Sequence, residues 1–174
     1  DLDQERFAAI WAARDAQTDV VYLFDEYRVT RAELAVHKEA LVKRGKWIPG
    51  LFDLKGRGRS KEESIKITDR LSDQLNLFTV DVEQDAALEE MRARLSTGRL
   101  KVFSHLNGWL GEYRQFRRDD DGEGAAPGGD HLIKATAMLL TYITDVATSE
   151  AASAIEVDYD RDREERKGNR TTGY

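Results

Sequence analysis

Apolar and polar residues alternate along two stretches near the start of the chain, and this alternation predicts two β-strands. The stretches are 7–13 (FAAIWAA) and 20–29 (VVYLFDEYRV), separated by a short polar segment. Two β-prone runs joined by a short polar turn predict an antiparallel hairpin. Continued alternation would place Asp25 on the same face of the second strand as Val21 and Leu23.

After the hairpin, sequence patterns typical of helices alternate with patterns typical of strands. Short apolar runs at 48–52, 77–80 and 100–103 predict strands buried on both faces, as in a parallel sheet. Apolar residues three or four positions apart predict helices between and after these runs. The expected helices run from Thr30 to Gly45, from Ser60 to near Asn76, from Asp81 or Asp85 to Gly98, over 105–116, and from Asp130 onward.

Residues with the chemistry of helix caps support these helix starts. Thr30 with Glu33, and Ser60 with Glu63, have the spacing of a capping box, in which two side chains satisfy free backbone N–H groups. Asp130 follows two glycines and is expected to cap the last long helix.

The order of these elements predicts an α/β domain with a mixed β-sheet and helices on both faces. We assign residues 1–147 to this domain, and we expect 117–129, which is rich in Gly, Ala and Asp, to form a loop. The stretch 148–174 is dense in charge and poor in apolar residues. It is therefore expected to be a charged tail that packs weakly or is flexible.

Composition narrows the class of protein without naming a function. The 174 residues are enough for one domain with a real core. No run approaches the length of a membrane span, and the first residues, DLDQERF, are too polar for a signal peptide. Because no Met precedes them, we expect an excised domain. The absence of cysteine excludes disulfides and thiolate sites, and the net charge of −6 argues against bulk attraction to nucleic acid.

Acidic residues from distant parts of the chain form the first candidate site. They are Asp1 or Asp3 at the start, Asp53 at the end of a central strand, and Asp130 at the start of the last long helix. Hard divalent cations such as Mg²⁺ take oxygen ligands, and two such ions can act together on a phosphodiester. Each acid also has a structural explanation: a solvated terminus, a turn after a strand, or a helix cap. Spacing alone leaves both interpretations open.

A basic, glycine-rich loop directly follows Asp53. Lys55, Arg57, Arg59 and Lys61 alternate with small residues, so that the backbone can approach a phosphate while Arg binds it in bidentate fashion. The nucleotide-binding pattern G-x-x-x-x-G-K-[ST] is absent from the chain. A solvated, mobile loop is the alternative interpretation.

The remaining candidates favour structural roles. His37 and His105 are expected on helix surfaces, and His131 is expected in an exposed first turn unless it contacts a metal or phosphate. Trp109 and Tyr113 are expected in the core rather than in base stacking. No His/Cys spacing indicates zinc, and no G-x-S-x-G motif indicates a serine nucleophile.

Three stretches together resemble a known family. They are PGLFD…GRGRS (49–60), LSTGRLKVFS…NGWLGEYRQFRRDDDG (95–122) and DHLIKA (130–135). They resemble the C-terminal nuclease domain of the large terminase subunit of tailed double-stranded DNA bacteriophages. The resemblance extends from the first residues to about residue 147.

The resemblance implies an RNase H-like fold and a metal-dependent endonuclease that cuts concatemeric double-stranded DNA during packaging. It implies that Asp1, Asp53 and Asp130 are catalytic and, with Asp3 as a further candidate, bind two Mg²⁺ or Mn²⁺ ions. An ion-activated water would attack the phosphorus while the second ion stabilises the leaving oxygen. DNA-backbone contacts are expected from a set of basic residues on both sides of the cleft: Lys55, Arg57, Arg59, Arg117 and Arg118.

The implied partners are DNA, the terminase ATPase domain, the portal protein and the small terminase subunit, in the cytoplasm of the host cell and without a membrane. Walker motifs of the ATPase are absent from this chain, so it should not translocate DNA alone. The loop 123–129 is rich in small residues where relatives often carry a hairpin strand. A non-catalytic docking module of the packaging motor, and an RNase H-like resolvase or transposase, are the alternatives.

Overall fold

Two hydrogen-bonded sheets form the framework of this computed structural model, which describes residues 6–53, 61–120 and 129–147. The first sheet has the order β1-β2-β5, and the second is the parallel pair β3-β4. The strands are β1 (Arg6–Asp15), β2 (Val20–Thr30), β3 (Gly50–Asp53), β4 (Leu77–Val80) and β5 (Leu100–Val102). The helices are α1 (Leu34–Gly45), α2 (Lys61–Ser72), α3 (Gln84–Ser96), α4 (Asn107–Asp120) and α5 (His131–Ala147). The tail 148–174 and the proposed cap Ser60 lie outside the described residues.

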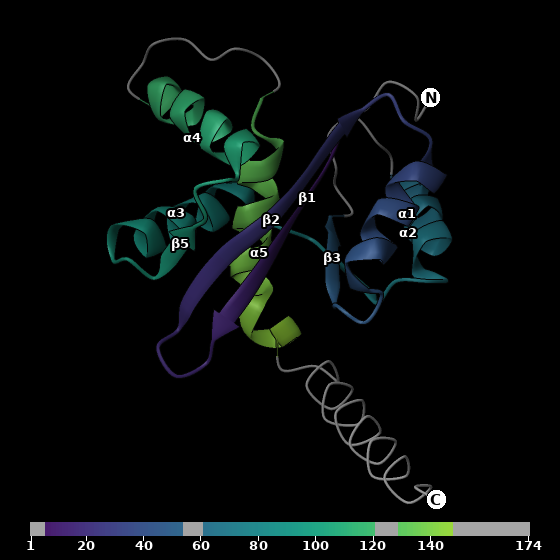
Figure 1. Cartoon of the computed structure of the whole chain (residues 1–174), viewed down its shortest axis with the longest axis horizontal. Coiled ribbons are helices and arrows are strands. Elements are labelled where there is room, and N and C mark those ends of the chain that lie inside the picture. The colour runs from purple at the N-terminus through teal and green to yellow at the C-terminus, as the bar shows by residue number, and fades with distance from the viewer. Residues whose placement is uncertain (1–5, 54–60, 121–128, 148–174) are drawn as a thin grey trace, which may run out of the picture.

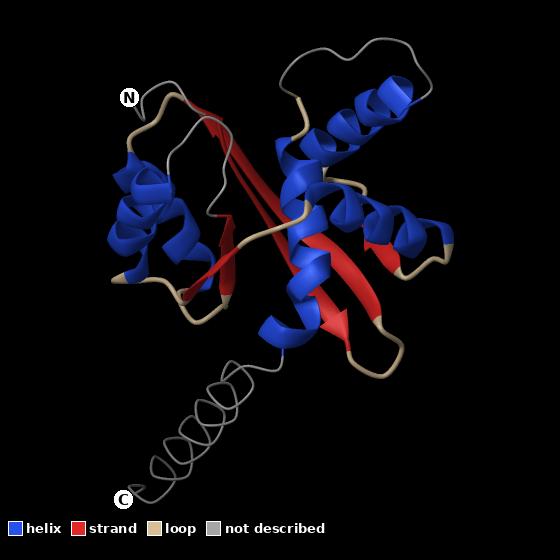
Figure 2. Ribbon diagram, turned by 180° about the vertical axis from the view of Figure 1, so that it is seen from behind, coloured by secondary structure: helices blue, strands red, loops and turns tan. Residues whose placement is uncertain are grey.

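Helices cover both faces of the β1-β2 hairpin. Figure 1 shows α5 behind the hairpin, with α3 and α4 to one side and α1 and α2 beside β3. Figure 2, seen from behind, shows α5 lying across the hairpin. β1 and β2 are antiparallel, and β2 and β5 are parallel, so the expected mixed sheet, hairpin and α/β class are confirmed.

A β-bulge in the hairpin decides which side chains face which helices. Trp11 pairs with Asp25, whereas its neighbour Ala12 pairs with Leu23, so one residue of β2 is extra. A bulge shifts the alternation of side chains by one position. Asp25 therefore lies on the α1 side and not with Leu23, and the prediction that it shares the face of Val21 and Leu23 is wrong.

The core has two parts. The larger cluster lies between the three-stranded sheet and helices α3, α4 and α5; its fully buried members are Val21, Leu23, Met91, Leu106, Trp109, Leu132 and Ile133. The smaller cluster is formed by Ile67, Leu71 and Leu75 of α2 and the following turn, with side chains of α1, β3 and β4 packed against it. Trp109 and Tyr113 stack in the larger cluster, which confirms their expected place in the core.

The expectation that β3 and β4 are buried on both faces is wrong. All four residues of β3 are half-buried, and Phe78 in β4 is 44% exposed. The reason is that these two strands pair only with each other in the described part of the chain, so each keeps one edge outside the sheet.

Several helix boundaries differ from the sequence prediction. Thr30 ends β2, and Arg31 then takes a left-handed conformation (φ 59°), so α1 begins after Glu33 without a side-chain cap. Glu83, rather than Asp81 or Asp85, caps α3, because its carboxylate accepts the N–H groups of residues 85 and 86. Helix α2 ends earlier than expected, at Ser72. Residues 117–120 are helical instead of looped, since α4 extends through them.

Two glutamates cap helices that lie far from them in sequence. Glu26 on β2 accepts the N–H groups of Gly108 (2.8 Å) and Trp109 (2.7 Å) at the start of α4. A Cβ at position 108 would lie only 2.9 Å from the Oε1 atom of Glu26, so glycine permits this approach. Glu112 on α4 accepts the N–H groups of Leu132 (2.7 Å) and Ile133 (3.3 Å) at the start of α5.

Glu112 also binds Arg28 of β2. Its Oε1 atom lies 2.7 Å from Arg28 Nη1, and the glutamate side chain is 3% exposed. A buried carboxylate is tolerated when a cation and hydrogen-bond donors surround it, and helix N-termini favour negative charge. Glu112 thus joins β2, α4 and α5 in one polar contact.

Replacing Glu112 by alanine should lower the free energy of unfolding by about 3–5 kcal/mol, because it leaves Arg28 and two buried N–H groups without their acceptor. Urea unfolding followed by circular dichroism measures this change. Glu89→Ala, at an exposed position of α3, is the control and should change stability by less than about 0.5 kcal/mol. Equal midpoints for the two variants would contradict the structural role of Glu112.

His37 is buried, contrary to the expected helix-surface position, whereas His105 is exposed. The Nδ1 atom of His37 lies 2.9 Å from the hydroxyl of Tyr27, and the His37 ring stacks on Phe7 with centroids 4.5 Å apart. Burial lowers the pKa of His37 below its usual value, and the backbone of Ala32 opposes this only in part.

The protein should lose stability through His37 as the solution is acidified. In the unfolded chain the imidazole of His37 binds a proton near pH 6.5, whereas in the folded chain its lowered pKa keeps it neutral to a lower pH. The stability that neutral His37 contributes is therefore complete above about pH 6.5 and is lost as the pH falls below that value. Unfolding free energies at about pH 7.5 and pH 5.5 should differ more in the wild type than in His37→Gln. His105→Gln is the matched control and should keep the wild-type difference; an unchanged difference in His37→Gln would refute the role of His37.

Candidate functional site

A cavity of about 590 Å³ lies between β1 and β3 and contains the polar side chains of interest. Asp53, Gln84, His131 and Lys134 line it, while most of the other lining residues are apolar. These four residues come from β3, α3 and α5. The cavity therefore brings together side chains that are up to about 80 positions apart in the sequence.

Asp53 reaches the cavity because it is the last residue of β3. It pairs in register with Val80 of β4, and its side chain is half-buried. The short apolar strand before it fixes the backbone, so the carboxylate is held at the strand end, where functional groups are often found in α/β sheets.

Asp130 directly precedes α5, and its backbone carbonyl accepts the N–H of Lys134 (2.9 Å) as the first turn of the helix forms. Its carboxylate lies 2.7 Å from the Nζ atom of Lys134, and both side chains are about 70% buried. Lys134, the partner of Asp130, lines the cavity together with Asp53, whereas Asp130 itself is not one of the lining residues. His131, next in sequence, lines it too and is half-buried instead of exposed.

The structure gives less information about the other predicted site residues. Asp1, Asp3, Lys55, Arg57 and Arg59 fall outside the described residues. Arg117 and Arg118 belong to helix α4, but only their backbone is described. Their role in binding DNA stays a prediction.

The donor chemistry of the cavity suits a hard cation only in part. Carboxylate oxygens such as those of Asp53 and Asp130 are the ligands that Mg²⁺ and Mn²⁺ prefer. Within residues 6–53, 61–120 and 129–147, however, no three acidic or histidine side chains come close enough to hold an ion. A complete site would need a further acid from outside these ranges, as the sequence predicts for Asp1 or Asp3.

Sequence reasoning missed two side chains of this cavity. Lys134 is one turn after Asp130, and that i,i+4 spacing of opposite charges is a signal that could have identified it. Gln84 carries no such signal. Its Nε2 atom is buried and has no hydrogen-bond partner among the described residues.

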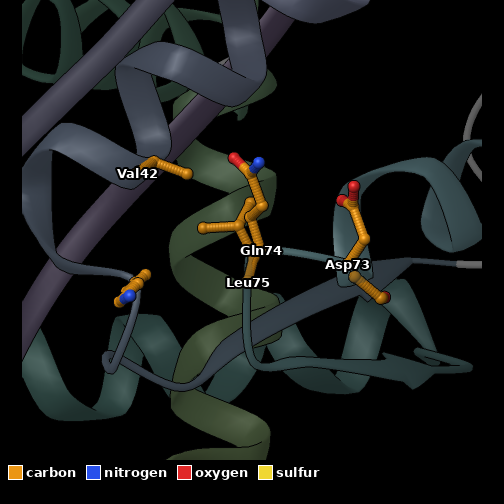
Figure 3. Close-up of a pocket in the computed structure, with 6 residues that line it drawn as sticks. Val42, Asp73, Gln74 and Leu75 are labelled. Atoms are coloured by element: carbon orange, nitrogen blue, oxygen red, sulfur yellow. The ribbon is translucent and has the colours of Figure 1, made fainter.

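A second hollow, of about 440 Å³, lies at the ends of α1 and α2 (Figure 3). Figure 3 shows Val42 of α1 near Gln74 and Leu75 of the turn after α2, with Asp73 to one side. Among the residues that the structure describes, Asp73 is the one acidic side chain that lines this hollow, and it pairs with Lys38. The hollow therefore lacks the set of acids expected of the site.

Comparisons with known proteins establish the fold. No protein-family model and no curated protein matches the sequence. Among solved structures, the chain is similar to the nuclease domain of the P22 large terminase, with a TM-score of 0.66 and 19% identity over 79% of this chain and 74% of that one. The chain thus has the mixed α/β fold of that nuclease domain, which agrees with the α/β class predicted from the sequence. No described helix is long and apolar enough to cross a membrane.

Proposed function

We propose that this chain is a divalent-metal-dependent endonuclease domain that cuts concatemeric double-stranded DNA for a viral packaging terminase. The observation that supports the proposal is that Asp53 lines one cavity with Lys134, the ion-pair partner of Asp130, in a fold similar to that of the P22 nuclease domain.

Asp53 and Asp130, with Asp1 or Asp3, would hold two Mg²⁺ or Mn²⁺ ions. Such ions stabilise the charge that develops on a phosphodiester during hydrolysis. Lys134 balances the charge of Asp130 and keeps its carboxylate at the first turn of α5. His131, which lines the cavity, would supply a further polar contact for a phosphate.

The hydrogen bonds around Glu112 support the convergence of Asp130 with the first acids. Arg28 lies opposite Ala8 near the start of β1 and binds Glu112, which caps α5 two residues after Asp130. The start of β1 and the start of α5 therefore lie at the same end of the sheet. Asp3 precedes Arg6 by three residues, a chain length that spans at most about 10 Å.

Lys55, Arg57 and Arg59, with Arg117 and Arg118, would bind the DNA backbone. Contacts to phosphate carry little base information, so cutting should be largely independent of sequence. We extend the proposal to the ATPase domain, the portal protein and the small terminase subunit as partners, and to the host cytoplasm as the site of action.

Asp53→Asn and Asp130→Asn should each reduce cleavage of a supercoiled plasmid by more than about a hundredfold in Mg²⁺ or Mn²⁺, because amides are poor ligands for hard cations. Gel electrophoresis of digests with each metal and with EDTA measures this. Asp69→Asn, at an exposed position of α2, is the matched control and should cut like the wild type. Full activity of both Asp53→Asn and Asp130→Asn would contradict the proposed site. Cleavage in EDTA would contradict the proposed metal dependence.

Arg57→Ala and Arg59→Ala should weaken DNA binding without abolishing cleavage at saturating protein. In an Asp53→Asn background, each lost phosphate contact should reduce the slope of log affinity against log salt by about 0.9. Fluorescence anisotropy with a labelled duplex at several salt concentrations measures the slope. Lys66→Ala, on the exposed side of α2, should leave it unchanged, and equal slopes in all variants would refute the basic loop as a DNA contact.

A further inference from the structure

Aromatic side chains lie exposed on the face of the β1-β2-β5 sheet that is turned away from the larger core cluster. Val21 and Leu23 of β2 are fully buried in that cluster, so Tyr22 and Phe24, which alternate with them, point to the opposite face. Phe103 continues the pattern directly after β5, where its N–H donates to the carbonyl of Leu23. Two neighbouring strands thus present three aromatic rings on one side of the sheet.

A cation lies among these rings. Lys101 of β5 pairs in register with Tyr22, precedes Phe103 by two residues, and is exposed. Within the described part of the chain, no carboxylate forms an ion pair with its ammonium. We call the following four residues together the aromatic face: Tyr22, Phe24, Lys101 and Phe103.

The aromatic face is not covered by any of the described helices. α1 lies on the same side of the hairpin, but it contacts the strands beyond the bulge, where Arg44 binds Asp25. In Figure 1, α5 lies behind the hairpin, and no labelled helix stands in front of its lower half. Tyr22 and Phe24 are accordingly each 37% exposed, and Phe103 is 45% exposed.

Two polar residues border the aromatic face. The Nε2 atom of His105 lies 3.0 Å from the carbonyl oxygen of Phe24, and its ring meets that of Phe103 edge-on, with centroids 5.8 Å apart. A neutral imidazole that donates from Nε2 keeps Nδ1 as an acceptor. Asp15, at the end of β1, is turned toward the hairpin loop, because its carboxylate accepts the hydroxyl of Thr18 (2.6 Å).

The size of the aromatic face and its cation argue against a protein partner. An aromatic side chain has a surface of about 150–250 Å², so the exposed parts of the three rings sum to about 180–300 Å². A stable protein interface needs about 800 Å² on each partner. Lysine is also depleted from the centres of such interfaces, whereas Lys101 stands in the middle of this surface.

We propose that the aromatic face binds single-stranded DNA, with bases stacked on its rings and a phosphate bound by Lys101. Exposed aromatic side chains on an open sheet, together with a cation, form a stacking platform for unpaired bases. Residues two positions apart in a strand are about 6.6 Å apart, about twice the 3.4 Å spacing of bases along a duplex. The rings therefore suit an unstacked strand, whose bases are free to separate.

This site goes beyond the proposed nuclease site, because none of the four residues of the aromatic face lines the cavity of Asp53. The choice of DNA over RNA rests on the proposed function, whereas the stacking itself does not. A strand held here would be bound on the sheet face at the hairpin end, away from the acids.

The experiment measures the fluorescence anisotropy of a labelled oligothymidine of about 12 nucleotides, a length within the range that such platforms cover. The full chain is used in EDTA, so binding is read without metal-dependent cleavage. Phe24→Leu and Phe103→Leu keep an apolar side chain but remove the ring, and each should weaken binding by about tenfold. Phe78→Leu, at a 44% exposed ring on β4, is the matched control and should bind like the wild type.

Lys101→Ala should reduce the slope of log affinity against log salt by about 0.7, the value for one phosphate of a single strand. An oligouridine of equal length should bind more weakly than the DNA. Equal affinities of the wild type, Phe24→Leu and Phe103→Leu, or an equal loss in Phe78→Leu, would overturn the site. Equal binding of the RNA would overturn the choice of DNA.

Size-exclusion chromatography with and without the oligonucleotide completes the test. The wild type should elute as a monomer and form a complex with the DNA. A dimer that the oligonucleotide does not dissociate and that fails to bind it would overturn the proposal in favour of self-association. Because plasmid cleavage is not the readout, a failure of this site leaves the test of the proposed function intact, and the reverse also holds.

Discussion

The buried carboxylate of Glu112 is the contact on which the arrangement of the larger core depends. It is held by a guanidinium from β2 and by two backbone N–H groups from α5, while the start of its own helix, α4, is capped by Glu26 of β2. Apolar packing alone allows helices to slide and rotate on a sheet, whereas these hydrogen bonds fix position. They hold the first turn of α5, and with it Asp130 and Lys134, at one end of the hairpin.

The bulge in β2, opposite Trp11 and Ala12 of β1, determines which side chains of β2 face which helix. Beyond it, Glu26 and Arg28 face α4, while Asp25 and Tyr27 face α1. On the α1 side, Arg44 binds Asp25 and lies 4.4 Å above the ring of Trp11. Neighbouring strand residues point to opposite faces in any case, and the one additional residue decides that Glu26 faces α4 and Asp25 faces α1.

Local patterns predicted most of the fold, and long-range contacts account for what they missed. The alternation in 7–13 and 20–29 identified the hairpin, and the spacing of Ile67, Leu71 and Leu75 identified the buried face of α2. A bulge leaves no mark in alternation, so the face of Asp25 was mispredicted. His37 resembles a surface residue until the ring of Phe7 and the hydroxyl of Tyr27, distant in sequence, enclose it.

The same division holds for the site. Asp53 and Asp130 could be selected because a strand end and a helix start are positions that sequence patterns locate well. Gln84 could not, because nothing nearby in sequence indicates that the first residue of α3 lines a cavity between β1, β3 and α5.

The acidic charge of the chain also fits the proposed chemistry when its local distribution is considered. A net charge of −6 repels DNA at long range, but this repulsion is screened beyond about 8–10 Å at physiological salt. At contact distance, the balance of positive and negative charges nearest to the DNA decides whether the DNA is attracted or repelled. Lys134 already neutralises Asp130, and under the proposed function bound cations would offset the remaining acids, so the basic loop after Asp53 would act on the phosphates against little opposing charge. The proposed function therefore requires an acidic domain whose acids near the DNA are paired, and the ion pair of Asp130 with Lys134 is consistent with that requirement.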